Sequence, residues 1–392
     1  MPPVLRTQPY DGPPLFSYGF RPFFLGASLF AGLAVLLWLP AYFGELTLPS
    51  AYPALDWHIH EMIYGYGAAA VAGFTLTAIP NWTGRLPLQG GKLIALAALW
   101  LAGRLAMAFS ALIGAVPAAV VDLAFLAALI AFVVRELGHG QSHNRKVALA
   151  LAILWFGDLV FHVEAIARGY ADYGVRIGLA ALILLVALIG GRIIPSFTRN
   201  WLARMNPGAL PAPADRWDVA AIVLAAVALA AWVAAPDAAP TGWALLAAGL
   251  AHAARLARWR GWRAGRDRLV LVLHVAYLFV PVGFVLTALS AFGLAPESAG
   301  VHAWAIGAIG GMTIAVMSRA ALGHTGRALI ASPAAQAVYA LVFAAAIARI
   351  YAALAPEHGF AALHVAAFAW IAAFFGFAAA YWRVFTGPRR AG

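Results

Sequence analysis

The sequence predicts an all-α membrane protein, and three observations carry this prediction. Apolar residues make up 64% of the chain, charged residues only 10%, and the mean hydropathy is +0.85, whereas the surface of a soluble domain requires far more charge. Apolar stretches long enough to cross a bilayer recur along the whole chain. Lysines and arginines gather in alternate loops between these stretches. Because a helix pairs its own backbone groups in hydrocarbon, helices are the expected spanning elements.

The expected transmembrane helices number twelve. The apolar stretches of roughly 20 residues lie at about 22–43, 57–80, 91–112, 117–138, 146–168, 174–195, 217–235, 241–258, 268–292, 300–320, 333–354 and 359–383. An even number of spans returns both ends of the chain to one side of the membrane. The connecting loops are short, so we expect a single transmembrane domain over residues 1–392.

The positive charges predict which side that is. All but four of the 26 Lys and Arg residues lie in the terminal segments and in the loops after every second span. The four exceptions are Arg104, Arg168, Arg176 and Arg349. Cytoplasmic loops are enriched in basic residues, so both termini are expected in the cytoplasm. The net charge of +11 therefore reflects topology and contact with membrane lipid, and we expect no nucleic-acid partner.

The chain also contains an internal repeat. His60 precedes Thr83 by 23 positions, and His302 precedes Thr325 by the same number. A weaker copy at 194–198 lies between them and has no histidine at its start. Spacings of this size correspond to about four spans per repeat. The three expected four-helix repeats cover about 18–138, 144–258 and 268–385.

Four histidines are expected at one depth near the outer face of the membrane. At about 1.5 Å per residue, His60, His302 and His364 lie within the first turns of their spans. His162 reaches a similar depth from the opposite side, and His58 lies just above the layer. Imidazole nitrogens brought from several helices into one dry layer are what a buried metal or haem requires. Packing at the interface is the plainer interpretation of any one of them.

Ionisable residues accompany these histidines. Asp158 lies one helical turn from His162, where it could orient the imidazole, relay protons or pair with Arg104. Arg104 could equally bind a haem propionate. Glu61 and Tyr64 occupy the second span, in which charged residues are a site hypothesis by default.

A second, inner group of histidines is the weaker candidate for a metal or haem site. His252 and His274 lie in spans, while His324, His139 and His143 lie in loops, where solvated side chains are the plainer interpretation. The chain has no cysteine, so any metal must bind His, Met or carboxylate ligands.

Several motifs together carry a family resemblance. They are Phe20–Phe24, His58–Met62, Gly73–Ala78, Pro80–Gly84, Gly190–Thr198, Leu273–Tyr277, His302–Ala303 and Leu322–Arg327. In these motifs, over nearly the whole chain, the sequence resembles the NnrS family, membrane proteins of the nitric oxide response in bacteria. The resemblance implies a multi-pass protein of the cytoplasmic membrane that contains haem b and copper and protects against nitrosative stress. It implies nitric oxide or nitrosylated metal species as partners, with a membrane or soluble electron donor.

A more distant resemblance concerns architecture. Twelve spans in three repeats are similar to the catalytic subunit of haem–copper oxidases and nitric oxide reductases. That similarity implies His60 and His302 as axial ligands of one haem. Spans 6 and 7 contain no histidine here, so a copper site of the oxidase type is not expected. Copper or a second haem is instead expected at the outer His58, His162 and His364, or at the inner His252, His274 and His324.

Two function classes follow. If the protein is an enzyme, it is expected to be an oxidoreductase acting on nitric oxide or nitrosylated metal complexes, with protons delivered by Glu61, Asp158 and Tyr64. The alternative is a transporter of a metal or a small organic ion. Broken helices would favour transport, and Pro281–Gly283 is the best such break in the sequence.

Overall fold

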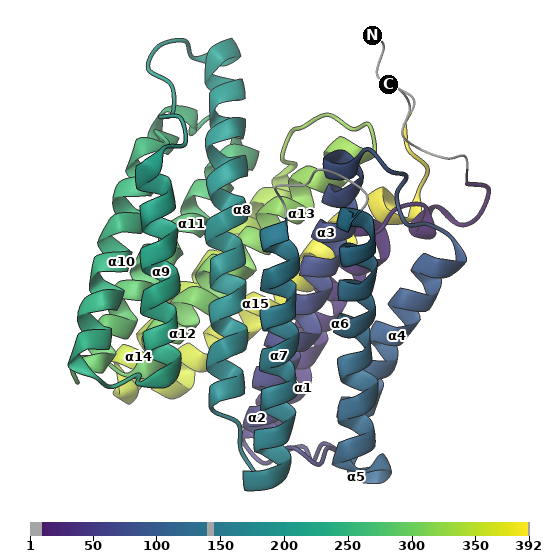
Figure 1. Ribbon diagram of the computed structural model, residues 1–392, viewed down its shortest axis with the longest axis vertical. Coiled ribbons are helices and arrows are strands. Elements are labelled where there is room, and N and C mark those ends of the chain that lie inside the picture. Colours follow the sequence, from purple (N-terminus) through teal and green to yellow (C-terminus); the bar gives the residue numbers. More distant parts are fainter. Residues whose placement is uncertain (1–9, 139–144, 391–392) are drawn as a thin grey trace. The chain divides into compact units, whose positions relative to one another are not determined.

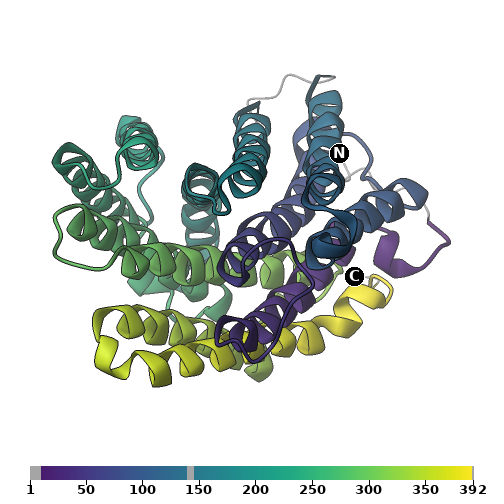
Figure 2. The same ribbon diagram turned by 90° about the horizontal axis from the view of Figure 1, so that it is seen from below.

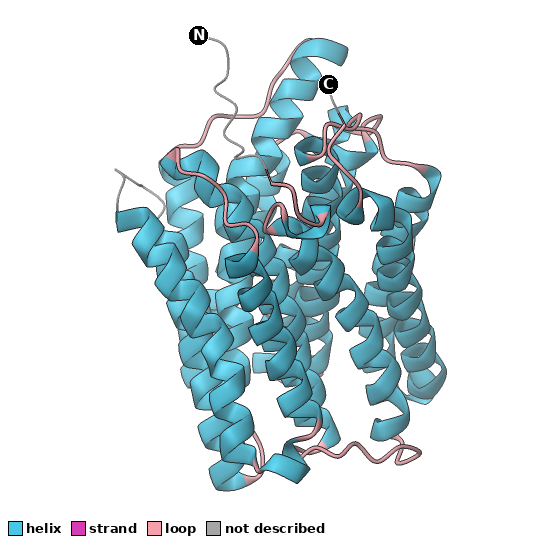
Figure 3. Ribbon diagram, turned by 90° about the vertical axis from the view of Figure 1, so that its right-hand side faces the viewer, coloured by secondary structure: helices cyan, strands magenta, loops and turns pink. Residues whose placement is uncertain are grey.

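A computed structural model describes residues 10–138 and 145–390, and its regular elements are all helices (Figures 1 and 3). Within these residues, eleven helices are long and apolar enough to cross a membrane. The all-α prediction is therefore confirmed, and the eleven candidate spans agree with a multi-pass membrane protein. The first half contains α1 (Phe20–Tyr42), α2 (Ala54–His60), α3 (Ala68–Thr83), α4 (Gly91–Ala108), α5 (Ser110–Ile113), α6 (Ala115–Gly138), α7 (Arg145–Arg168) and α8 (Tyr173–Met205). The second half contains α9 (Arg216–Ala234), α10 (Ala239–Arg258), α11 (Arg268–Ala291), α12 (Glu297–His302), α13 (Gly311–His324), α14 (Pro333–Leu354) and α15 (Gly359–Thr386).

The helix expected at 241–258 forms as α10 but is not among the eleven apolar helices. Its buried polar side chains Thr241, His252 and Arg255 explain the difference, because each lowers the hydropathy of a helix of only 20 residues. Other helices supply partners for two of these groups: Nδ1 of His252 lies 2.8 Å from the hydroxyl of Tyr277 on α11, and Arg255 donates to Asp218 on α9 at 2.8 Å.

The chain divides into two compact units. The first consists of Met1–Ala181, Ala321–Arg327 and Ala378–Gly392. In this unit α1 packs on α3, and α6 packs on both α4 and α7. The buried Arg21 at the start of α1 donates to the carbonyl oxygens of Phe385 (2.8 Å) and Gly387 (2.6 Å). The arginine of the Phe20–Phe24 motif therefore caps the last helix of the chain.

The second unit consists of Leu182–Ala320 and Ala328–Phe377. In it α10 packs between α9 and α11, which are the teal and green helices at the left of Figure 2. α11 runs as one α-helix through Pro281, so the expected break at Pro281–Gly283 is absent. The threefold repeat within a single domain stays a prediction.

The spans that carry His60 and His302 share an unusual local structure. His60 is followed by a π-helical segment, Glu61–Gly67, and His302 by another, Ala303–Gly310. π-Helical turns are rare and occur frequently at functional sites. The two segments occupy equivalent positions in the first and third expected repeats. Their side chains differ, because the acid Glu61 corresponds to the apolar Ala303.

Several helices begin at a capping side chain. Asp215 accepts hydrogen bonds from the backbone at the start of α9, Asp267 does so at α11, and Ser332 at α14. Such caps satisfy amide groups that have no partner within the helix. Arg258 forms an ion pair with Asp215 and lowers the pKa of that carboxyl to about 2, so the cap of α9 stays charged well below neutral pH.

Gly174, near the start of α8, has no room for a side chain. A Cβ atom there would lie 2.7 Å from Cβ of Phe161 and closer still to the Phe161 backbone. We expect Gly174→Ala to separate α8 from α7 and to lower the free energy of unfolding by about 1–3 kcal/mol, measured by thermal unfolding in detergent. Gly91→Ala is the matched control, because nothing lies within 4 Å of a Cβ there. An equal loss in both variants would contradict this explanation.

Candidate metal centre

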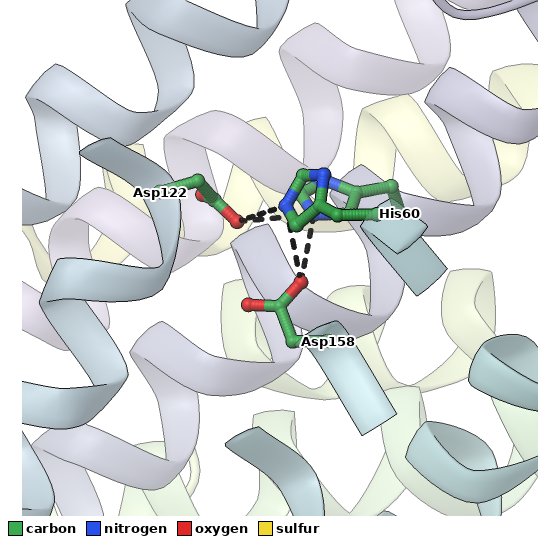
Figure 4. Close-up of side chains that lie close together, drawn as sticks. His60, Asp122 and Asp158 are labelled. Atoms are coloured by element: carbon green, nitrogen blue, oxygen red, sulfur yellow. Dashed lines mark hydrogen bonds and ion pairs between the residues drawn. The ribbon is translucent and has the colours of Figure 1, made fainter. Parts of the chain in front are cut away.

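Four ionisable side chains converge inside the first unit. His60 ends α2, Asp122 lies on α6, and Asp158 and His162 lie one turn apart on α7. Each offers one ligand atom, and the four atoms lie within 4.8 Å of one another. All four residues are buried, with side-chain exposures of 2% or less. Figure 4 shows Asp122 and Asp158 pointing toward the ring of His60. We call this group the metal centre.

The distances within the metal centre fit a single ion. Nε2 of His60 lies 3.0 Å from Oδ1 of Asp158 and 3.1 Å from Oδ2 of Asp122. Nε2 of His162 lies 3.2 Å from Asp122 Oδ2 and 3.5 Å from Asp158 Oδ1. An ion with four bonds of about 2.0–2.1 Å in tetrahedral geometry sets its ligand atoms roughly 3.3–3.4 Å apart. The four nitrogen–oxygen separations are close to that value.

A buried arginine borders the metal centre. The guanidinium of Arg104 on α4 forms ion pairs with Glu61 and Asp122. It pairs with these acids and not with Asp158, whose carboxylate faces the two histidines. The backbone of the π-helical segment Glu61–Gly67 lies next to this ion pair. A Cβ atom at Gly65 would lie 2.6 Å from Oε2 of Glu61 and closer still to the guanidinium of Arg104. A glycine at this position therefore makes room for the ion pair.

The second ring nitrogen of each histidine also has a partner. Nδ1 of His60 lies 3.3 Å from Oε1 of Glu61. Nδ1 of His162 lies 2.8 Å from the hydroxyl of Tyr52, in the loop between α1 and α2. Burial raises the pKa of the Tyr52 phenol, and the nearby carboxylates Asp122 and Asp158 raise it further, so the phenol remains protonated.

Tyr64, which we expected to deliver protons, lies beside the metal centre. Its ring centroid is 5.4 Å from that of His60, and its hydroxyl donates to the carbonyl oxygen of Gly174 at 2.6 Å. Glu164, on the same helix as His162, accepts from the backbone amides of Asp172 and Gly174. Glu164 therefore holds the turn between α7 and α8.

The other outer histidines have different surroundings. His58 stacks on Trp38 with ring centroids 4.0 Å apart. In the second unit, Nδ1 of His302 donates to the carbonyl oxygen of Ser298 at 2.7 Å, four residues earlier. Nδ1 of His364 donates in the same way to Phe360, at 2.8 Å. Of the four histidines expected at one depth, His60 and His162 are the two that the metal centre brings together, with ring centroids 4.9 Å apart.

The inner histidines are hydrogen-bonded or stacked separately. Nδ1 of His252 lies 2.8 Å from the hydroxyl of Tyr277, and Nε2 of His274 lies 2.8 Å from Oγ1 of Thr198. His324 stacks on Tyr18 with centroids 5.5 Å apart. None of the three belongs to a group of metal-type ligands among the described residues. His139 and His143 lie outside those residues.

Sequence reasoning missed two members of this network. Asp122 is an acid within an apolar span, so the rule that singled out Asp158 also applied to it. Tyr52 lies outside every span, and no sequence pattern connects it with His162.

No curated protein matches the chain. The family model described as "NnrS protein" matches residues 14–389, which is nearly the full length. The chain belongs to the NnrS family.

Proposed function

We propose that this chain is a metal-binding membrane protein of the nitric oxide response, with its ion at the metal centre of His60, Asp122, Asp158 and His162. The observation that carries the proposal is the convergence of four buried ligand atoms within 4.8 Å. Membership of the NnrS family supplies the connection with nitric oxide. Nitric oxide or a nitrosylated metal complex is therefore the proposed partner.

Copper is the proposed ion. Two imidazole nitrogens and two carboxylate oxygens suit Cu(II), and they also suit Zn(II) and Fe(II). The family resemblance implies copper, and Cu(II) binds most tightly of the divalent first-row ions at a given N/O site. A bound copper ion would supply a redox-active centre able to bind nitric oxide. The residues around it orient the ion, exclude water and hold protons nearby.

The surroundings of His60 do not fit an axial haem ligand. Its Nε2 atom faces Asp158 at 3.0 Å and Asp122 at 3.1 Å, where an iron and its macrocycle would have to lie. Arg104 is engaged with Glu61 and Asp122 and so does not fit a propionate partner. His302 does have suitable chemistry, because donation from Nδ1 leaves the lone pair on Nε2. No step of the proposal passes through haem b.

The formal charge of the site is compatible with a divalent cation. Glu61, Asp122 and Asp158 contribute three formal negative charges and Arg104 one positive charge, which leaves a net charge of −2 beside neutral histidines. Buried charge is costly unless it is compensated. One divalent ion, or two protons on the histidines, would restore neutrality. Reduction of nitric oxide consumes protons, and the carboxylates of Glu61 and Asp158 both lie within hydrogen-bonding distance of His60.

The proposed setting is the cytoplasmic membrane of a bacterium, with both termini inside the cell. The basic residues in alternate loops support this orientation. With α10 included, the chain crosses the membrane twelve times. A membrane or soluble electron donor would supply electrons for any turnover.

Copper binding by the full chain in detergent tests the proposal. The protein is stripped with a chelator, titrated with Cu²⁺ and followed by electron paramagnetic resonance before and after anaerobic addition of nitric oxide. We expect one copper per chain, splitting from two nitrogen ligands and a spectrum that nitric oxide changes. A bound copper whose spectrum ignores nitric oxide would contradict the proposed partner. A chain that binds no copper would overturn the proposed function and favour the transporter alternative.

A further inference from the structure

The loop between α1 and α2 sends one side chain into the metal centre. Tyr52 is 5% exposed, although its neighbours Ala51 and Pro53 are exposed. Its hydroxyl lies 2.8 Å from Nδ1 of His162 and 3.5 Å from the carbonyl oxygen of Ala115. A surface loop thus contributes a buried phenol to the site.

Hydrogen bonds hold this loop in place. The backbone amide of Ala51 donates to the hydroxyl of Ser110 at 2.8 Å, and the hydroxyls of Ser50 and Ser110 lie 3.2 Å apart. The amide of Ala111 donates to the carbonyl oxygen of Pro49 at 3.0 Å. Because Ser110 begins α5, the loop is attached to the turn that follows α4. The segment that leads into Tyr52 is therefore anchored by hydrogen bonds to Ser110 and Ala111.

The contact between Tyr52 and His162 determines which ring nitrogen of His162 faces Asp122 and Asp158. The rings of Tyr52 and His162 meet edge to face, with centroids 5.7 Å apart, and the phenol also packs near Phe161 at 6.2 Å. With Nδ1 engaged by the hydroxyl, Nε2 is the nitrogen directed at Asp122 and Asp158. A metal-bound imidazole needs its lone pair on the ligating nitrogen and its proton on the other.

We propose that Tyr52 is a positioning residue of the metal centre, which holds the ring of His162 so that Nε2 ligates the ion while Nδ1–H donates to the phenol oxygen. The Tyr52 hydroxyl then donates toward the carbonyl oxygen of Ala115. This inference rests on the proposed function. Glu61 has the corresponding place beside Nδ1 of His60, so each proposed imidazole ligand has a partner for its second nitrogen. Partners of this kind set ring orientation and ligand basicity.

Tyr52→Phe tests the inference, because it keeps the aromatic ring and removes only the hydroxyl. The full-length protein in detergent is stripped of metal and titrated with Cu²⁺. We expect the affinity to fall about 10–100-fold and the spectrum of bound Cu(II) to shift, while the metal-free variant unfolds near the wild-type temperature. A purely structural role for Tyr52 would lower the unfolding temperature without changing the copper spectrum.

The matched control is Tyr277→Phe in the second unit. It removes another buried Tyr–His contact, 2.8 Å from Nδ1 of His252, and should leave copper affinity unchanged. Wild-type affinity and spectrum in Tyr52→Phe would overturn the positioning role and leave the proposed function standing. Failure of the wild-type chain to bind copper would overturn the proposed function itself. If Tyr52→Phe does not fold, Ser110→Ala loosens the same loop, and an unchanged affinity there would overturn the inference.

Discussion

Arg104→Met is expected to destabilise the protein by about 3–5 kcal/mol, because it leaves buried carboxylates without their cation. The arginine side chain is 3% exposed and forms ion pairs with Glu61 and Asp122, which are as deeply buried. Methionine retains much of the side-chain volume of arginine, so the lost stability would reflect the missing positive charge more than a change in packing. The measurement is thermal or denaturant unfolding of the metal-free protein in detergent.

Arg85→Met provides the contrast. Arg85 lies 2.5 Å from Glu136 but is 44% exposed, and Glu136 keeps a second partner in Arg135 at 3.1 Å. Because Arg85 is largely solvated and the buried Glu136 keeps Arg135, we expect a loss of about 0–1 kcal/mol, as for solvent-exposed pairs. Equal losses for the two variants would contradict the view that Arg104 compensates buried charge. Adding Glu61→Gln to Arg104→Met should restore part of the stability, because one of the uncompensated charges is removed.

His162→Ala is expected to lower copper affinity by more than ~100-fold, since loss of a ligand should exceed the loss of a partner beside it. His162 supplies one of the two imidazole nitrogens of the metal centre and lies close to Asp122 and Asp158. Without it, His60 and the two aspartates would be the remaining ligands. The bound Cu(II) that remains should show splitting from a single nitrogen ligand. Titration with Cu²⁺ and the spectrum of the loaded protein measure both effects.

His58→Ala is the control for this prediction. Its ring stacks on Trp38 at 4.0 Å and does not belong to the metal centre. It lies two residues from His60, so a general disturbance of α2 would affect both variants. If His58→Ala lost copper as severely as His162→Ala, the assignment of the ligands would be wrong.

The sequence predicted the helices well, because helix formation depends on local properties. Apolar length located the spans, and the rise per residue placed His60 and His162 at one level, where their rings do meet. Depth alone does not say which way a side chain points around its helix. His302 and His364 were expected at the same level. Nδ1 of each donates to a carbonyl oxygen of its own helix, and their role as ligands stays a prediction.

Which ionisable side chains pair with one another depends on packing between helices, and no local sequence pattern encodes that packing. Pairing with Arg104 was one of three roles considered for Asp158, but Arg104 pairs with Glu61 and with Asp122, an acid that the sequence pattern did not single out. The π-helical segment after His60 changes the direction of the following side chains, and a regular α-helix had been assumed. Tyr52 reaches the metal centre from a loop, so its role follows only from three-dimensional structure.

The central claim is that a metal ion binds between His60, Asp122, Asp158 and His162. Crystals of the full-length protein soaked with Cu²⁺, with diffraction measured on both sides of the copper absorption edge, test it most directly. We expect one strong anomalous peak within bonding distance of both Nε2 atoms and the two carboxylates. A peak at other histidines, with none at this position, would contradict the account.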